Sequence, residues 1–302
     1  MTTDAHSIAT VGIAGLGLMG SACAGRLSQA GFALVGYDVD AGRRSAFAGE
    51  GRRAAASLAD LAGCDAVVLA VFDTAQVEAV VEGKGGLIAA GRDHGRLPLV
   101  VCTSTCDPDR IAALAGRCAA AGVAFVEMPI SGTSASLSKG DAVGLVAGEA
   151  DAIARAAALL DALCPQRHLL GAAGQGGRAK LAVNLVLGLN RGALAEGLVF
   201  AQRLGLEPEP FLDVLIGSAA FSQVMKVKGP MMAARTFEPA QSRVGQSRKD
   251  YALILEQAAV HGQALPFAQV YAGLMAELAD RGEGERDNAL IVEAIARRRV
   301  ES

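Results

Sequence analysis

A glycine-rich turn near the N-terminus constrains this chain more than any other feature. Gly15, Gly17 and Gly20 have the spacing GxGxxG, and an apolar run with strand character, residues 9–14, leads directly into them. Residues 21–30 then have the pattern of a helix. The strand, turn and helix that a dinucleotide site requires therefore follow one another in the right order.

Each glycine of this turn has its own physical task. Gly15 makes the tight turn, Gly17 lets the backbone approach a pyrophosphate, and Gly20 lets the helix pack closely on the strand. The N-terminus of the helix offers free N–H groups and the positive end of its dipole to the phosphates. The sequence therefore predicts a dinucleotide site, whose first binding residues are Gly15, Gly17, Leu18, Met19 and Gly20.

An acid at the end of the next expected strand, 33–37, bears on the choice of cofactor. Asp38 lies 18 residues after Gly20, where a carboxylate accepts hydrogen bonds from the ribose hydroxyls and repels a 2′-phosphate. We therefore expect NAD in preference to NADP. Arg43 and Arg44 qualify this prediction, because either side chain could turn toward a phosphate.

Length and composition exclude several classes of function. The 302 residues allow a sizeable core and two domains. A net charge of −3 and the lack of a basic stripe argue against a nucleic-acid partner. No uninterrupted apolar run reaches the roughly 18 residues of a membrane span. Residues 1–7 lack the basic and apolar parts of a secretory leader, so a cytoplasmic location without a membrane partner is expected.

The cysteines do not have the spacing of a metal site. Cys102 and Cys106 could form half of one, but no second pair of ligands accompanies them, and the histidines are far apart in sequence. No metal site is predicted. Reduced thiols in the core are expected, and the remaining ones are Cys23, Cys64, Cys118 and Cys164.

The first half of the chain alternates short apolar runs with helical stretches, which is typical of a doubly wound parallel sheet. After the glycine-rich segment 171–177 the alternation stops, and only helical patterns follow. We therefore predict an α/β protein with an N-terminal Rossmann-type domain, residues 1–173, and an all-α domain, residues 174–302. A long helix over 178–204 is expected to join them. The expected strands are 8–14, 33–37, 66–71, 99–102, 124–128, 143–147 and 167–170.

Two polar residues interrupt the otherwise apolar long helix. Lys180 and Asn184 have i, i+4 spacing, which puts both on one helix face, and Gly188 continues that face. One interpretation is a polar pair at the solvent edge of an ordinary helix. The other is a wet internal cleft, where burial lowers the pKa of a lysine so that it exchanges a proton with a hydroxyl or carbonyl. Asn184 would then position substrate oxygens.

Two further clusters carry polar groups. Pro129 to Ser134 follow the expected strand 124–128, and hydroxyls and glycine at the carboxyl end of a strand suit an anion such as a carboxylate. A plain surface loop has the same composition. Lys249 and Asp250 open a later helix, and such a pair alone is usually a surface ion pair.

Taken together, these residues resemble the β-hydroxyacid dehydrogenase family, which includes the 3-hydroxyisobutyrate dehydrogenase and tartronate semialdehyde reductase types. The resemblance runs from about Ile8 to Arg299, with markers at Gly15–Gly20, Thr103–Pro108, Pro129–Gly132, Gly174–Lys180 with Asn184, Lys249–Asp250 and Gly284–Asp287. It implies reversible NAD-dependent oxidation of a 3-hydroxy acid to its 3-oxo acid or semialdehyde. It also implies a homodimer or homotetramer.

The resemblance assigns a role to each candidate residue. Lys180 is implied to be the catalytic acid/base. The substrate is implied to bind at Ser131, Gly132 and Asn184, with Thr133 in the same loop. Further cofactor contacts are implied at Phe72, Asp73, Thr105 and Lys249.

The chain departs from the family pattern in two places. Thr133 stands where relatives usually have a second glycine, which adds bulk and a hydroxyl to the carboxylate-binding loop. The polar segment 241–248 replaces an apolar stretch, so a more polar pocket and a hydroxylated or second-acid substrate are expected. The alternative functions are a catalytically silent dinucleotide-binding module, an imine reductase, and an oxidative decarboxylase of a sugar-acid phosphate.

Overall fold

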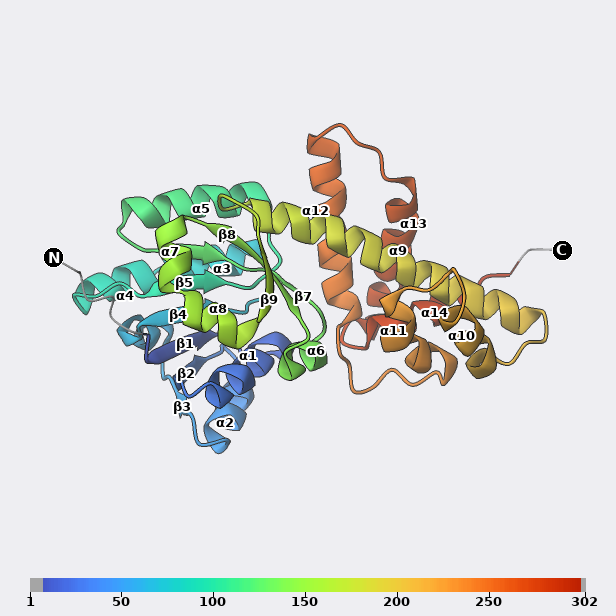
Figure 1. The fold of residues 1–302 in the computed structure, drawn as a ribbon, viewed down its shortest axis with the longest axis horizontal. Coiled ribbons are helices and arrows are strands. Elements are labelled where there is room, and N and C mark those ends of the chain that lie inside the picture. Colours follow the sequence, from blue (N-terminus) through green and yellow to red (C-terminus); the bar gives the residue numbers. More distant parts are fainter. Residues whose placement is uncertain (1–7, 300–302) are drawn as a thin grey trace. The chain divides into compact units, whose positions relative to one another are not determined.

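The computed structural model describes residues 8–299, which divide after Lys180 into two compact units (Figure 1). Each unit has a core of its own. Residues 1–7, on which the expectation of no secretory leader rests, lie outside the described residues.

The first unit is built on a sheet with the strand order β3-β2-β1-β4-β5-β6-β8-β7, and β9 pairs with β8. The strands are β1 (Thr10–Ala14), β2 (Ala33–Tyr37), β3 (Arg53–Ala54), β4 (Ala66–Leu69), β5 (Leu99–Cys102), β6 (Phe125–Glu127), β7 (Ile130–Ser131), β8 (Val143–Gly148) and β9 (Gln166–Leu169). From β3 to β6 all neighbours are parallel, which confirms the predicted sheet. β8 runs antiparallel to β6 and β7, so the far edge is mixed. The prediction missed β3 and β7, because two residues carry no alternating pattern.

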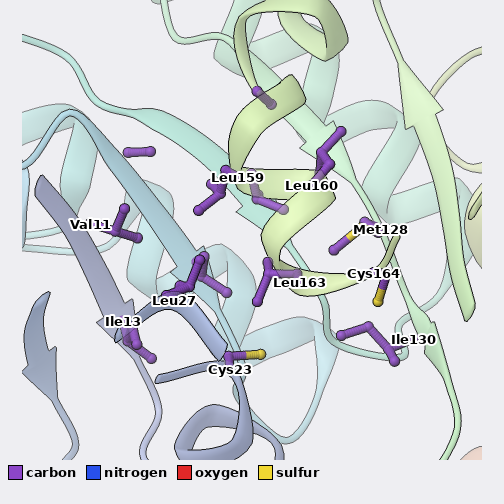
Figure 2. Packing of buried hydrophobic residues seen from close by; sticks show 14 of the residues in the cluster. Val11, Ile13, Cys23, Leu27, Met128, Ile130, Leu159, Leu160, Leu163 and Cys164 are labelled. Atoms are coloured by element: carbon purple, nitrogen blue, oxygen red, sulfur yellow. The ribbon is translucent and has the colours of Figure 1, made fainter. Parts of the chain in front are cut away.

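The central strands are buried on both faces, as a sheet covered by two helical layers requires. Val68 of β4 and Val101 of β5 pack on one face, while their neighbours Val67 and Val100 pack on the other. On the first face, Leu27 and the residues around it cover β1, as Figure 2 shows. The helices of this unit are α1 (Leu18–Gln29), α2 (Ala41–Gly49), α3 (Thr74–Glu82), α4 (Leu87–Asp93), α5 (Pro108–Ala120), α6 (Ser134–Lys139), α7 (Ala150–Arg155) and α8 (Ala157–Leu163), with a 3₁₀ turn at Leu58–Gly63.

The helices of the first unit begin and end at signals of different strength in the sequence. Asp107 accepts hydrogen bonds from the backbone N–H groups of Asp109 and Arg110 at 2.9 Å each, so it caps α5. Residues 150–163 do not form one continuous helix, because the helix is divided at Ala156 into α7 and α8. α4 and α6 were not predicted, since both are short and follow glycine-containing loops.

The second unit is all helical, as predicted. Its helices are α9 (Gln175–Arg203), which begins in the first unit, α10 (Pro208–Ile216), α11 (Gln223–Ala233), α12 (Val244–Val260), α13 (Pro266–Leu278) and α14 (Ile291–Ala296), with short π and 3₁₀ turns at Ala279–Glu283 and Asn288–Leu290. The 29 residues of α9 fit the expected interdomain helix. It begins a turn earlier than predicted, at Gln175 rather than Arg178.

By length and composition alone, α9 is apolar enough to cross a membrane. Its polar side chains nevertheless have buried protein partners: Asn184 donates to Asp250, and Arg191 donates to the Tyr271 hydroxyl. Leu194 lies in the core of the second unit. These contacts are those of a core helix in a globular domain.

All six cysteines are buried and unbridged, in agreement with the expectation of core thiols. Burial raises the pKa of Cys23 to about 12 and the pKa of Cys64 to about 11. Such thiols are poor nucleophiles. Among residues 8–299, no group of three His, Cys, Asp or Glu side chains is arranged to hold a metal ion.

Candidate active site

The glycine turn after β1 has a conformation that only glycine allows. Gly15 has φ of +95°, and a Cβ there would lie 2.4 Å from the carbonyl oxygen of Ala70. A Cβ at Gly20 would lie 1.9 Å from the carbonyl oxygen of Gly15. By contrast, the nearest atom to a Cβ at Gly17 is a guanidinium nitrogen of Arg43, at 3.9 Å. The turn is therefore tight at its two ends and open at Gly17.

The open position lies at the start of a helix. Gly17 is the N-cap of α1, and no side chain caps this helix, whose first residues are Leu18 and Met19. Bare N–H groups beside an uncrowded glycine are what a pyrophosphate needs. This part of the chain therefore fits NAD(P).

Asp38, at the end of β2, is 5% exposed and joined to the glycine turn. Its carboxylate accepts hydrogen bonds from the backbone N–H of Leu16 at 2.7 Å and of Asp40 at 2.9 Å. The guanidinium of Arg43 lies 3.4 Å from the same carboxylate. Arg44 instead donates to the carbonyl oxygen of Asp38 at 2.6 Å. Both arginines thus lie at the end of β2, and each is bound to Asp38.

The loops after β4 and β5 are fastened to each other by a serine that the sequence analysis did not single out. The hydroxyl of Ser104 donates to the carbonyl of Val71 at 2.8 Å and accepts from its N–H at 3.0 Å. Phe72, next in the chain, is half exposed, and Asp73 caps α3. Thr105 is buried. Because β2, β1, β4 and β5 are parallel neighbours, these loops, Asp38 and the glycine turn lie at one edge of the sheet.

Lys180 is 6% exposed, and its ammonium donates to the carbonyl oxygen of Ile130 at 2.7 Å. Ser131 follows Ile130 directly, so the lysine head lies at the start of the loop Ser131–Thr133. Gly132 has φ of +148°, and a Cβ there would lie 3.0 Å from the Cβ of Ala142. The fold therefore brings together Lys180 and the loop that the sequence proposed for a carboxylate.

Thr133 has a structural task in this loop. Its hydroxyl accepts a hydrogen bond from the backbone N–H of Ser136 at 3.2 Å and lies 3.1 Å from the Ser136 hydroxyl. Thr133 is thereby the N-cap of α6. The hydroxyl that this residue adds to the loop is engaged by the next helix.

In the second unit, Asn184 and Asp250 form a buried pair. The amide nitrogen of Asn184 donates to one carboxylate oxygen of Asp250 at 2.9 Å, and the ammonium of Lys249 lies 2.9 Å from the other. Asn184 is 9% exposed and Asp250 7% exposed. The interpretation of Lys249 and Asp250 as a surface ion pair is therefore wrong.

The long helix has an inverted pattern of polarity. Its buried face carries Lys180, Asn184 and Gly188, and a Cβ at Gly188 would lie 2.2 Å from the hydroxyl of Tyr251. Its exposed face carries apolar side chains such as Val186, which is 58% exposed. The solvent-edge interpretation of Lys180 and Asn184 is thus wrong.

The polar segment 241–248 is bound to other parts of its own unit. The hydroxyl of Ser247 accepts a hydrogen bond from Asn288 at 2.9 Å. Arg243 lies 3.2 Å from Glu285. These partners hold the start of α12 in place. Ser247 and Arg243 therefore stabilise the second unit, independently of any contribution to a substrate pocket.

Glu127 was missed, although its partners lie at the start of the helix that carries Lys180. It is 2% exposed in β6, and its carboxylate accepts hydrogen bonds from the backbone N–H groups of Gly174 and Gly177 at the start of α9. Burial raises the pKa of this carboxyl, although the backbone N–H bonds oppose the shift. The available signal was an isolated acid in the apolar strand 124–128.

Two family profiles match the chain and together cover nearly all of it. The profile of the NAD binding domain of 6-phosphogluconate dehydrogenase matches residues 10–171. The profile described as the NAD-binding domain of NADP-dependent 3-hydroxyisobutyrate dehydrogenase matches residues 174–295.

Individual proteins match over almost the same span. The L-threonate dehydrogenase of Cupriavidus necator is 32% identical, over 93% of this chain and 94% of its own. The 2-hydroxy-3-oxopropionate reductase of Escherichia coli is 28% identical, over 94% of this chain and 96% of its own. The crystal structure of 3-hydroxyisobutyrate dehydrogenase from Salmonella typhimurium superposes with a TM-score of 0.84 at 25% identity, covering 94% of this chain and 99% of that one.

Proposed function

Because this chain belongs to the β-hydroxyacid dehydrogenase family, we propose that Lys180 is the general acid/base of a reversible, NAD(P)-dependent oxidation of a 3-hydroxy acid. The observation that carries this role is the hydrogen bond from the Lys180 ammonium to Ile130, which holds the lysine beside Ser131. The product is the corresponding 3-oxo acid or semialdehyde. The proposed domains are residues 1–173 for the cofactor and 174–302 for substrate and assembly.

In the oxidation, NAD(P)⁺ supplies the acceptor for the hydride that leaves the substrate carbon. Ser131, Gly132 and Thr133 bind the substrate carboxylate through N–H groups and hydroxyls. In oxidation the neutral amine of Lys180 accepts the hydroxyl proton and becomes the ammonium, and in reduction the ammonium gives this proton to the carbonyl oxygen. Asn184, oriented by Asp250, donates to a substrate oxygen through its second amide hydrogen.

The cofactor is held by the sheet edge of the first unit. The N–H groups at Gly17, Leu18 and Met19 bind the pyrophosphate, and Gly15 and Gly20 keep the turn tight. Further contacts come from Phe72, Asp73, Thr105 and Lys249. We propose that NAD is preferred over NADP, since the Asp38 carboxylate would accept hydrogen bonds from the ribose hydroxyls and repel a 2′-phosphate. The preference for NAD is partial rather than absolute, because Arg43, which pairs with this carboxylate, can turn toward a phosphate.

The position of Lys180 argues against two of the alternative functions, the imine reductase and the silent module. Lys180 is buried with its ammonium on a backbone carbonyl, and imine reductases generally lack a lysine here. A silent module has no need of such a lysine. From the polar segment 241–248 we expected a hydroxylated or second-acid substrate, and the relative named L-threonate dehydrogenase supports the hydroxylated one.

We further propose that two copies of the chain associate through the second unit. An apolar cavity of about 1100 Å³ lies between α9 and α13, and its lining includes Phe200, 64% exposed, and Phe267, 75% exposed. Exposed apolar surface of this kind is typical of protein interfaces. Glu196 and Arg203 line the same cavity and lie two turns apart on α9. A second copy whose α9 runs antiparallel can therefore place its own Arg203 opposite Glu196 and its own Glu196 opposite Arg203. Phe267→Asp is expected to halve the mass measured by sedimentation, and an unchanged mass would exclude this face.

The test of the catalytic role is NADH formation at 340 nm with a panel of hydroxy acids that includes L-threonate and 3-hydroxyisobutyrate. Lys180→Ala is expected to lower kcat about 10²- to 10⁴-fold, because it removes the proton acceptor. NADH binding, measured by fluorescence, should stay within about twofold, since Lys180 lies outside the glycine turn.

Lys84→Ala is the matched control, because Lys84 is an exposed lysine in the loop between α3 and α4. It should behave as wild type. Turnover retained by Lys180→Ala would remove the lysine from the mechanism. Turnover by no hydroxy acid, despite NADH binding, would favour the silent module.

A further inference from the structure

The glycine-rich segment before α9 is a tightly packed joint rather than a loose linker. Gly174 has φ of +94°, and a Cβ there would lie 2.8 Å from the carbonyl oxygen of Pro108. A Cβ at Gly176 would lie 2.7 Å from the carbonyl oxygen of Leu145. Both glycines are therefore needed so that the start of α9 can pack against the rest of the first unit.

The group at the centre of this joint is the carboxylate of Glu127. One of its oxygens accepts from the N–H of Gly174 at 2.7 Å, and the other accepts from the N–H of Gly177 at 2.8 Å. A Cβ at Gly177 would lie only 2.9 Å from the nearer oxygen. The carboxylate thus binds the exposed donors at the start of a 29-residue helix, where its charge also complements the helix dipole.

The same stretch of chain also holds the head of Lys180. Ile130, three residues after Glu127, accepts the hydrogen bond from the lysine ammonium at 2.7 Å. Lys180 itself lies three residues after Gly177, one turn along α9. Residues 127–130 therefore bind the beginning of α9 at two points. Glu127 binds the backbone of the helix, and Ile130 binds its lysine.

From this geometry we propose that Glu127 is a positioning residue for the reaction: its carboxylate fixes the first turn of α9, so that the Lys180 ammonium is held at the carbonyl of Ile130, beside Ser131. This inference rests on the role of Lys180 proposed above. Glu127 acts only through the helix. A shift of about 1 Å in a catalytic group can cost about 10²-fold in rate, so loss of this clamp is expected to lower kcat through the position of Lys180.

The variant that tests the clamp is Glu127→Gln. Its side chain has the same shape but keeps a single accepting oxygen and turns an NH₂ group toward one backbone N–H. We expect kcat to fall about 10- to 100-fold, while KM and the Kd for NADH stay within about twofold. Glu127→Asp, which keeps both oxygens on a shorter side chain, should recover part of kcat.

A second readout reports on Lys180 without turnover. Reductive methylation of the cofactor-free protein, followed by mass spectrometry, measures how accessible the lysine amine is. In wild type Lys180 is only 6% exposed, so slow labelling is expected, and Glu127→Gln should label several-fold faster. This readout remains informative if Lys180→Ala shows that Lys180 has no catalytic role.

Asp65→Asn is the matched control, because the Asp65 carboxylate also accepts two backbone N–H bonds, from Ala9 at 2.9 Å and Thr10 at 2.8 Å, where β1 begins. It should lower the thermal midpoint and leave kcat and lysine labelling unchanged. Were Glu127→Gln to lower stability with kcat and labelling as in wild type, Glu127 would serve folding only, and the proposal would be overturned. If Glu127→Gln does not fold, Gly177→Ala displaces the same carboxylate and must give the same loss of kcat.

Discussion

A buried ion pair in the second unit gives the sharpest test of how this protein is stabilised. Lys228 of α11 donates to both carboxylate oxygens of Asp287, at 2.8 and 2.7 Å, and the two side chains are 3% and 0% exposed. Asp287 also accepts from the backbone N–H groups of Gln241 at 2.8 Å and Ser242 at 3.2 Å. The pair therefore ties α11 to the segment that leads into α12.

Removing one partner leaves a buried charge, which typically costs about 3–5 kcal/mol. For Lys228→Met we expect the lower end, about 3 kcal/mol, because backbone N–H groups still solvate Asp287. For Asp287→Asn we expect about 4 kcal/mol, since the amide has one accepting oxygen and leaves the buried lysine without its carboxylate. The double variant buries no charge and should lose at least about 2 kcal/mol less than the sum of the single losses.

Urea unfolding at pH 7, followed by circular dichroism, measures these free energies. Burial lowers the pKa of Lys228 to about 8, opposed by Asp287, so the lysine is still charged at pH 7. Arg248→Met is the control, because Arg248 and Asp280 form an exposed pair at 3.1 Å. It should cost less than about 1 kcal/mol. Single losses that add within about 0.5 kcal/mol in the double variant would refute the reasoning.

Four further substitutions test other parts of the structure. Asp38→Asn should lower kcat/KM for NAD about tenfold or more, since a charged acceptor for the ribose is lost, whereas Arg43→Ala should lower kcat/KM for NADP alone. Steady-state assays with both cofactors measure these changes. An unchanged preference for NAD in Asp38→Asn would count against the role assigned to Asp38. Gly188→Ala places a Cβ 2.2 Å from the Tyr251 hydroxyl and should destabilise the protein by about 1–3 kcal/mol in urea unfolding; an unchanged midpoint would contradict this packing. Backbone N–H bonds lower the pKa of Asp60 below 3.8. The ionised Asp60 therefore stabilises the folded protein fully above that pH, and this contribution is lost as the pH falls through the folded-state pKa. Asp60→Asn should flatten the acid side of a pH–stability curve, and identical curves would exclude this contribution.

The sequence by itself determined the features that depend on local chemistry. The GxGxxG spacing after a strand specifies a turn that only glycine can make, and the structure has it at Gly15 and Gly20. Apolar runs that alternate with helical stretches specified the parallel strands from β2 to β6, because strands buried on both faces are largely apolar. The i, i+4 spacing of Lys180 and Asn184 placed both on one face of α9.

Only the tertiary structure decided which way that face points and what holds it. Polar residues on an apolar helix are consistent with a solvent edge or a buried cleft, and burial of Lys180 depends on β7, fifty residues away in sequence. The same holds for Glu127, because in the sequence its partners Gly174 and Gly177 mark only a glycine-rich domain boundary, and only folding packs the strand against them. Spacing along a chain fixes the backbone geometry of neighbours, whereas the environment of a charge is set by segments that only folding brings to it.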